Sequence, residues 1–339
     1  MSRRTSLIVA LVASLALLLF VSANLFSAFF NSGEIQTTAD PDSSSTGDFI
    51  GMGHMMGGNQ TVILDESGQR MVALQLPELL EPDSESASEI TYTVSAQAGE
   101  TAFLEGETTQ TLGYNGSYLG PVLVVHEGQE VHIKTENRLS EPTSFHWHGL
   151  KLPSDMDGGP HHPVGPNETM QVDFTVKQEA ATLWFHPHAL GTTAEQVYAG
   201  LAGLIFVEDD NSDQLDLPKD YGVNDFPLIV QDRTFDVDNQ FDYAGTYNPD
   251  GTYGDTLLIN GTINPYVEVK NEQIRLRLVN GSNARNYTFG LENGAEFHQI
   301  ASDGGFLEQP VALTSVTLTP GERAEIIVDL SEYAEGDTL

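Results

Sequence analysis

The sequence predicts an all-β protein made of two consecutive β-sandwich domains, and three observations lead to this fold class. After residue 90, many short stretches alternate apolar and polar residues, which is the pattern of half-buried strands. No long amphipathic helix pattern interrupts them, and the one short helix that we expect lies around residues 192–200 (TTAEQVYAG). A set of residues also recurs in the same order in the second half of the chain.

Residues 1–30 have the features of an export signal or a membrane anchor. Arg3 and Arg4 precede an apolar run over residues 7–23, and small residues suited to signal cleavage end that run. The arginines also resemble a twin-arginine signal, although the Phe usually found after them is missing. Because the apolar stretch continues through residues 24–30, an uncleaved anchor is the alternative to cleavage. Either way, we expect the body of the protein to work outside the cytoplasm, in a periplasmic or extracellular location.

Residues 31–69 predict a flexible leader, because they are rich in Ser, Thr, Asp, Gly and Met. Within this leader, GMGHMMGG places His54 among methionines. Thioether and imidazole ligands together favour Cu(I), so the leader is suited to transient copper capture. The same composition also arises in leaders that bind nothing.

The composition limits the classes of function. The chain has 14 Lys and Arg residues against 49 Asp and Glu residues, a formal net charge of −35. Such a surface repels phosphate backbones, so we expect no nucleic-acid partner; adaptation to salt or to an acidic medium is a sufficient explanation of the charge. The sequence contains no cysteine. It therefore forms no disulfide and offers no thiolate to a metal.

The expected strands follow one another along the chain. Residues 122–137 (VLVVHEGQEVHIKTEN) read as two strands around a Glu-Gly turn. Residues 170–176 (MQVDFTV) place four apolar side chains on one face, and residues 201–209 (LAGLIFVED) read as a buried strand. Residues 273–280 (QIRLRLVN) and 324–330 (AEIIVDL) repeat the alternation. Many short strands of this kind are typical of sandwiches and barrels.

The internal repeat divides the chain into two similar domains. Residues of the same type recur in the same order: Asn115, Gly116, Pro121, Gln129 and Asn137, and then Asn260, Gly261, Pro265, Gln273 and Asn280. We therefore predict a first domain over residues 70–209 and a second over residues 220–339. The polar stretch 208–220 (EDDNSDQLDLPKD) is suited to a linker between them.

Two His-x-His pairs are the strongest functional signal. SFHWHGL carries His146 and His148, and WFHPHAL carries His186 and His188. On a strand, residues i and i+2 point to the same face, so two such strands side by side would bring four imidazoles into one pocket. Imidazole binds copper, zinc, iron and nickel, and burying four imidazoles without a metal would be costly. We therefore predict a metal site in the first domain.

The second domain is expected to lack this site. The corresponding strand reads NYTFGL, with Tyr287 and Phe289 at the histidine positions. Among the other histidines, His126 and His132 are expected to be solvated on the outward faces of strands. We expect His298 to be packed or hydrogen-bonded.

These residues resemble a known family. YNGSYLGPVLVV, the two histidine motifs and LINGTINPYVEV are similar to the first two domains of multicopper oxidases, with bacterial periplasmic cuprous oxidases and laccase-like enzymes as nearest kin. The resemblance runs from about residue 70 to the last residue. It implies two cupredoxin-like Greek-key β-sandwiches. It also implies an oxidoreductase that couples one-electron oxidation of cuprous ion or phenols to the reduction of dioxygen to water, with a place in copper homeostasis.

The resemblance further implies roles for single residues. His146 resembles the ligand of a type 2 copper ion, and His148, His186 and His188 resemble ligands of the type 3 copper pair. Asp157, in SDMDGG, matches an acid that helps to deliver protons to the copper cluster in the family. From the residues alone, Asp157 is equally well a turn or capping aspartate.

The sequence departs from the family pattern in one respect. The family's remaining ligands lie in a third domain, in His-x-x-His-x-His and His-Cys-His motifs, and neither motif occurs in these 339 residues. We therefore expect the N-terminal two domains of a multicopper oxidase, without a type 1 copper site and with half of the trinuclear ligands. The alternative is a non-catalytic exported protein that binds or buffers copper.

Overall fold

The computed structural model describes residues 68–339, apart from residues 247, 335–336 and 338. The predicted export signal (1–30) and nearly all of the predicted leader (31–69), including His54, lie outside the described residues. Within the described part of the chain, no helix is long and apolar enough to cross a membrane. The signal, the anchor and the leader therefore stay predictions.

The first half of the described chain contains strands and two short helices. These elements are β1 (Val72–Ala73), β2 (Ser84–Glu85), β3 (Glu89–Thr101), β4 (Thr109–Tyr114), β5 (Val122–His126), β6 (Glu130–Asn137), β7 (His146–His148), β8 (Thr169–Thr175), β9 (Ala181–His186), α2 (Thr193–Ala199), β10 (Gly203–Glu208) and α3 (Asp210–Gln214). Helix α2 lies within the one segment for which the sequence predicted a helix. Helix α3 lies in the predicted linker and begins with a capping box, in which the Asp209 and Ser212 side chains each bond the other's backbone N–H.

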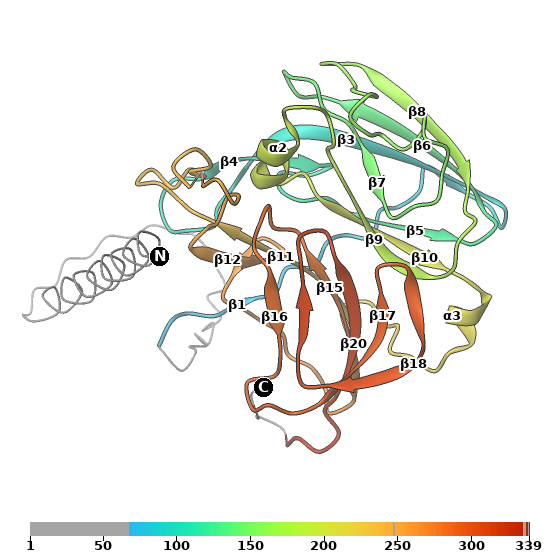
Figure 1. The fold of residues 1–339 in the computed structure, drawn as a ribbon, viewed down its shortest axis with the longest axis vertical. Helices are drawn as coiled ribbons and strands as arrows, with labels where there is room; N and C mark the ends of the chain where they lie inside the picture. Colours follow the sequence, from blue (N-terminus) through green and yellow to red (C-terminus); the bar gives the residue numbers. More distant parts are fainter. Residues whose placement is uncertain (1–67, 247, 335–336, 338) are drawn as a thin grey trace, which may run out of the picture. The chain divides into compact units, whose positions relative to one another are not determined.

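The first half forms a sandwich of two sheets. One sheet has the order β2-β3-β6-β8, with β4 also paired to β3, and the other has the order β5-β10-β9-β7. Figure 1 shows β3, β6 and β8 in one layer and β7, β9 and β10 in the next. As predicted, Val172, Phe174 and Val176 share a buried face. Strand β10 is buried over nearly its whole length.

The predicted Glu-Gly turn connects the two layers of this sandwich. Strand β5 pairs with β10 in one sheet, whereas β6 pairs with β3 and β8 in the other. Gly128 adopts a positive φ of 83° at the turn, a conformation that suits a residue without a Cβ. The two strands are therefore neighbours in sequence but belong to opposite layers.

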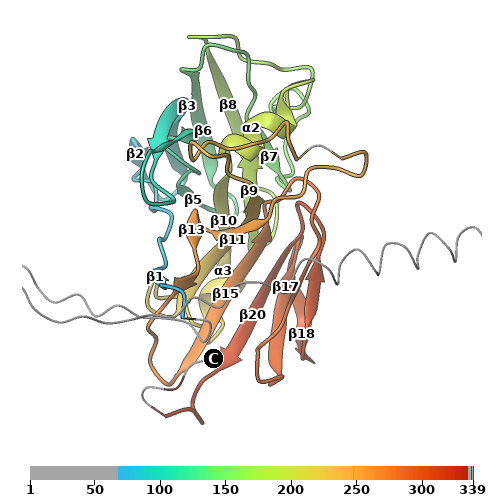
Figure 2. The same cartoon turned by 90° about the vertical axis from the view of Figure 1, so that its left-hand side faces the viewer.

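The second half contains a large sheet and a small one. Its strands are β11 (Asp225–Arg233), β12 (Thr256–Ile259), β13 (Thr262–Ile263), β14 (Pro265–Tyr266), β15 (Gln273–Asn280), β16 (Tyr287–Phe289), β17 (Phe297–Ser302), β18 (Gly305–Leu313), β19 (Val316–Leu318) and β20 (Arg323–Asp329). The order in the large sheet is β13-β12-β11-β15-β20-β17-β18, and Figure 2 shows β15, β20, β17 and β18 side by side. Strands β16 and β19 form a two-stranded sheet that shares an apolar core with the large one.

The internal repeat is visible in the structure as repeated backbone contacts. Asn115 and Asn260 both adopt positive φ angles, 56° and 49°. Each amide oxygen accepts a bond from the strand beside it: from the Ser95 N–H at 2.6 Å and from the Ile229 N–H at 2.8 Å. The pairing of β3 with β6 is parallel, and so is the pairing of β11 with β15. The prediction of an all-β chain with two related halves is confirmed.

The two halves contact each other through an apolar cluster and a group of buried charges. Trp184, Leu204 and Phe206 of the first half belong to the same cluster as Ile229 and Val279 of the second. The charged side chains of the contact form a separate group, and all four are buried: Arg275, Arg277, Asp225 and Glu325. Alternation in β15 and β20 correctly predicted strands, but it did not show that the polar face of each is covered by the other half.

Candidate metal centre

The structure brings the four predicted histidines together. Strands β7 and β9 are antiparallel neighbours, and His146 lies directly opposite His186. The His146 ring centroid is 5.3 Å from that of His186 and 5.0 Å from that of His188, and the His148 and His186 centroids are 5.4 Å apart. His186 is buried, His146 and His148 are half-buried, and His188 is exposed. Of the four side chains, that of His188 is the one most open to solvent.

The residues between the histidines anchor the two strands. Trp147 and Phe185 point to the opposite face, as strand geometry requires, and neither is exposed (0%). Their rings lie 5.5 Å apart in the apolar core of the sandwich. Burial of these two side chains sets which face of β7 and β9 carries the imidazoles, because a shift of one residue would reverse it.

Hydrogen bonds select the nitrogen that each imidazole presents. His146 Nδ1 donates to the carbonyl of Asp157 at 2.9 Å, and His186 Nδ1 donates to the carbonyl of Pro187 at 2.9 Å. With the proton held on Nδ1, the lone pair of each neutral ring lies on Nε2. Such bonds commonly orient histidines that bind metals.

Two nitrogens of neighbouring rings lie at hydrogen-bond distance, where a neutral His148 can donate from Nδ1 to the lone pair of His186 Nε2. His148 Nδ1 is 3.2 Å from His186 Nε2. Two nitrogens on one tetrahedral metal ion, each about 2.0 Å from it, would lie about 3.3 Å apart. The ligand atoms of His146, His148 and His186 all lie within 4.8 Å of one another. This spacing fits a bound metal ion.

The electrostatics favour neutral, metal-ready imidazoles. Burial lowers the pKa of His186 to about 3, against the opposing effect of its bond to Pro187. Burial also lowers the pKa of His148 to about 4, and the Arg323 guanidinium adds to the effect. Both rings are neutral near pH 7, which is the form that binds a metal.

Asp157 lies beside His146, as the sequence interpretation required. Its carbonyl accepts from His146 Nδ1, and its carboxylate Oδ1 is 3.4 Å from the same nitrogen. The next residue, Gly158, has φ of 65°, and a Cβ there would lie 1.9 Å from the Phe145 carbonyl oxygen. Only glycine lets this loop approach β7 so closely. Asp157 thus orients His146, while a role in proton delivery stays a prediction.

Sequence reasoning missed the groups that hold the strand ends. The Ser144 hydroxyl accepts from the His188 backbone N–H at 2.7 Å. Gln196 on α2 accepts from the Thr143 hydroxyl at 2.8 Å and donates to the Pro142 carbonyl at 2.9 Å. The Trp184 ring stacks on His186, with centroids 4.1 Å apart. Little in the sequence indicated the role of Gln196, because its bonding partners lie 53 and 54 positions away.

His126, His132 and His298 lie outside this cluster. His132 pairs with Asp173 at 2.6 Å on the outward side of the first half, and His126 lies 3.5 Å from Asp213. The bond to Asp173 raises the pKa of His132. His298 is exposed on β17. The expectation that it is packed is therefore wrong, because β17 lies near the edge of the large sheet with this residue turned outward.

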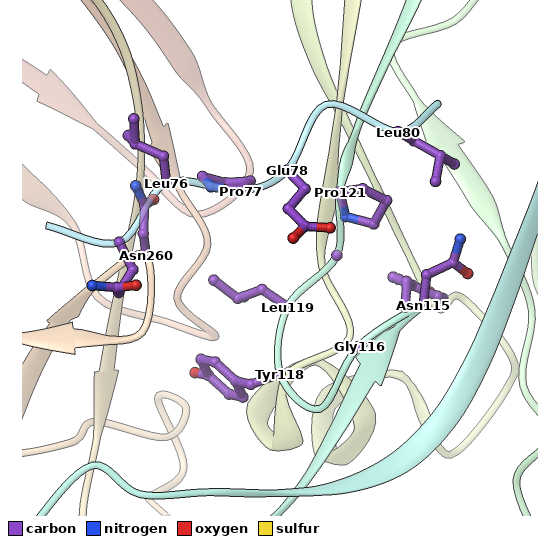
Figure 3. A pocket seen from close by; sticks show the side chains of 13 residues that line it. Leu76, Pro77, Glu78, Leu80, Asn115, Gly116, Tyr118, Leu119, Pro121 and Asn260 are labelled. Atoms are coloured by element: carbon purple, nitrogen blue, oxygen red, sulfur yellow. The ribbon is translucent and has the colours of Figure 1, made fainter. Parts of the chain in front are cut away.

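A cavity of about 370 Å³ lies elsewhere in the molecule. Figure 3 shows it between the segment that carries Pro77 and Glu78, the turn that carries Tyr118 and Leu119, and Asn260 of the second half. None of the four clustered histidines is among its lining residues. The histidine cluster is therefore a separate feature of the fold.

Comparison with known proteins places the chain in a family. Two family models described as multicopper oxidase match residues 95–212 and 226–337. The multicopper oxidase mco of Staphylococcus aureus is 46% identical over 269 residues, covering 79% of this chain and 60% of that protein. The cell division protein FtsP of Escherichia coli K12 is 42% identical over 267 residues, covering 77% and 55%.

Solved structures agree with these matches. A laccase from Pediococcus acidilactici has a TM-score of 0.78 and 45% identity, covering 81% of this chain and 59% of that one. The chain spans about 60% of the length of the S. aureus relative. The likeness supports the cupredoxin-like sandwich fold in both halves. Together, the two matched segments and these relatives show that the chain belongs to the multicopper oxidase family.

Proposed function

We propose that His146, His148, His186 and His188 hold copper in an oxidase that couples one-electron oxidation of a reducing substrate to the reduction of dioxygen to water. The observation that carries this proposal is the convergence of four imidazoles, three from β7 and β9 and one from His188 just after β9, with His148 Nδ1 and His186 Nε2 3.2 Å apart. An all-imidazole set suits copper, and the family implies it. Cuprous ion and phenols are the substrate classes that we propose.

Each residue of the site has its own proposed role. His146 takes the type 2 position, and His148, His186 and His188 contribute to the type 3 pair. Copper, when bound, supplies one-electron redox chemistry and the reduction of dioxygen. Asp157 keeps the proton of His146 on Nδ1 through its carbonyl, and its carboxylate lies close enough to pass protons towards the cluster.

The described residues supply one side of such a centre. The 339 residues contain no cysteine, so the thiolate of a type 1 copper, and the remaining imidazoles of the trinuclear cluster, would come from outside this sequence. We also propose that the protein works after export, because residues 1–30 have the pattern of an export signal.

A second candidate is an exported protein that binds or buffers copper without oxidising a substrate. Histidines that converge in a sequence without cysteine favour it, because copper binding needs only the imidazoles. The likeness to FtsP, described as a cell division protein, also shows that relatives of this chain carry names other than oxidase.

The test is to load the chain of 339 residues with copper and to measure binding, the visible spectrum and oxygen uptake. We expect copper binding that falls in the double variant His146→Ala with His186→Ala to what the leader around His54 holds, and that is retained in the control His298→Ala, which removes an exposed histidine. We expect no intense blue band and no turnover of phenol or cuprous ion by this chain alone.

The outcomes separate the candidates. Copper binding that is undiminished in the double variant would contradict both candidates. Oxygen consumption that depends on these histidines would show that the 339 residues suffice for catalysis. If copper-dependent oxidation appears only when a polypeptide with the missing ligands is added, the oxidase function is supported over buffering.

A further inference from the structure

The second half of the chain contacts β9 near its first residues, just beyond the last residue of β7. Arg323, on β20, is buried, and its Nε donates to the carbonyl of Thr182 on β9 at 3.2 Å. Strand β7 pairs only with residues 184–186 of β9. Arg323 therefore bonds a part of β9 that lies beyond the end of β7, four residues before His186.

The guanidinium of Arg323 is fixed from its own half. Nη2 donates to the Asp303 carbonyl at 2.7 Å, and Nη1 donates to the Gly321 carbonyl at 3.0 Å. The Asp303 carboxylate lies 3.2 Å from Nη1 and accepts from the Arg323 backbone N–H at 2.6 Å. A planar guanidinium held on several sides has little freedom to move. The contact with Thr182 is thus made from a rigid base.

Thr182 is held by two further residues of the second half. Its hydroxyl donates to Glu325 at 2.6 Å and accepts from Arg277 at 2.9 Å. Because Thr182 and His186 belong to the same strand, these bonds fix β9 along its length. The strand that carries His186 is therefore attached to the half of the chain without copper ligands.

Two glycines, Gly149 and Gly321, allow Arg323 and the turn before it to lie close to His148. Gly149, directly after this histidine, has φ of 96°, and a Cβ there would lie 2.9 Å from Arg323 Nη2. This glycine both makes the turn after β7 and leaves space for the guanidinium. From the second half, a Cβ on Gly321 would lie 3.4 Å from His148 Cε1. The His148 ring is thus packed against the turn that precedes Arg323.

We propose that Arg323 is a positioning residue for the copper ligands of the first half. It holds β9 and borders the turn after His148, and so keeps the close approach of His148 Nδ1 and His186 Nε2. The inference rests on the proposed function, since it assigns these nitrogens to copper. A positioning role for Arg323 also gives the second half a function at the site, although it carries none of the four histidines. Its bonds fix the position of β9 relative to β7.

The test compares Arg323→Met and Arg323→Lys with the control Arg285→Met. Arg285 bonds Asp232 and the Gly254 carbonyl within the second half, so its loss removes a charge without touching β9. Three quantities are measured: Cu(II) affinity by chelator competition, the electron paramagnetic resonance spectrum of the copper-loaded chain, and thermal unfolding of the copper-free chain. We expect about 10-fold weaker binding and a broadened copper spectrum in Arg323→Met, as is usual when a group that orients a ligand is lost.

Arg323→Lys should recover part of both properties, because an ammonium keeps the charge and can still donate hydrogen bonds, although without the planar geometry of the guanidinium. Arg285→Met should match the original chain in Cu(II) affinity and copper spectrum, even if loss of the bond to buried Asp232 lowers its unfolding temperature. If Arg323→Met lowers only the unfolding temperature, while affinity and spectrum stay unchanged, Arg323 is merely structural and the inference is overturned. Tighter Cu(II) binding in Arg323→Met would overturn it as well, since charge repulsion would then outweigh positioning.

Two controls keep these readings separate. Should Arg323→Met fail to fold, Arg323→Lys decides the question by its spectrum alone. Copper binding by the original chain that is insensitive to His146→Ala with His186→Ala defeats the proposed function, and the inference falls with it. Histidine-dependent binding that is indifferent to Arg323 defeats the inference only.

Discussion

The two halves of the chain share a framework but differ at the positions that matter for chemistry. In the first half, β7 carries His146 and His148, whereas β16 carries Tyr287 and Phe289 at the matching positions. Tyr287 bonds the Ser282 hydroxyl at 2.8 Å within the second half. One copy of the fold therefore uses these positions to gather imidazoles, and the other uses them for packing and a local hydrogen bond.

What the halves share lies in the turns. Asn137 and Asn280 end matching strands and are both fully buried. The Asn137 amide donates to the Val164 carbonyl at 2.8 Å, and the Asn280 amide donates to the Leu318 carbonyl at 2.9 Å. Residues that satisfy buried backbone groups are thus retained in both copies, while residues on the open face of a strand are free to differ.

The same strand position also has opposite environments in the two halves. Lys134 on β6 is half-exposed, with 50% of its side chain accessible, and pairs with Glu136 at 2.6 Å. Arg277, at the matching position on β15, is buried and bonds Asp225 at 2.7 Å. The covering half makes the difference, because the Arg277 guanidinium also lies 4.0 Å from the centre of the Phe206 ring.

The largest effect is expected from this pair of positions. Arg277→Met leaves Asp225 buried with one fewer partner, and should lower the free energy of unfolding by about 3–5 kcal/mol. Lys134→Met removes an exposed ion pair and should cost less than about 1 kcal/mol. Urea unfolding of both variants is the measurement. Equal losses would contradict the view that coverage by the other half sets the energetics.

An intermediate and equal effect is expected at the shared turns. Asn137→Ala and Asn280→Ala each leave buried carbonyls without a donor, so each should lower the free energy of unfolding by about 2–3 kcal/mol. The variants are compared by urea unfolding, with His298→Ala as a surface control. A loss confined to one of the two would show that the repeated bonds are not equivalent.

The last effect, absent at neutral pH, is an acid sensitivity that arises from the histidines of the first half. The folded-state pKa values of His148 (about 4) and His186 (about 3) lie below the ordinary value of 6.5. The unfolded chain therefore binds more protons than the folded chain as the pH falls below about 6.5, and the copper-free chain should lose stability between there and about pH 3. Above pH 6.5 these groups should cause no change.

His148→Phe copies the second half, where Phe289 occupies the matching position. In this variant, the unfolding temperature should fall less between pH 6.5 and pH 4 than in the original chain. Thermal unfolding of the copper-free chain across this range is the measurement. An unchanged slope would mean that His148 is not a source of the acid sensitivity.

Several features could be predicted from the sequence because they depend on local period and on repeated turn residues. Alternation in residues 170–176 predicted the buried face of β8, and the His-x-His spacing predicted that His146 and His148 share a face of β7. For the second pair the strand ends at His186, so His188 lies beyond it. Recurrence of Asn115 and Asn260 predicted two related halves. The proposed metal site required one further step, the side-by-side placement of β7 and β9, whose facing is set by the burial of Trp147 and Phe185.

Only the tertiary structure decided how the halves support each other. Alternation shows that a strand has two faces, but not whether another part of the chain covers the polar one, so the burial of Arg275 and Arg277 was not predictable. The same holds for Arg323, which bonds Thr182 across 141 positions of sequence. Contacts of this range depend on how two sheets pack, and no local pattern encodes them. By itself, the sequence determined which residues could bind copper; the packing of the second half decided what holds them in place.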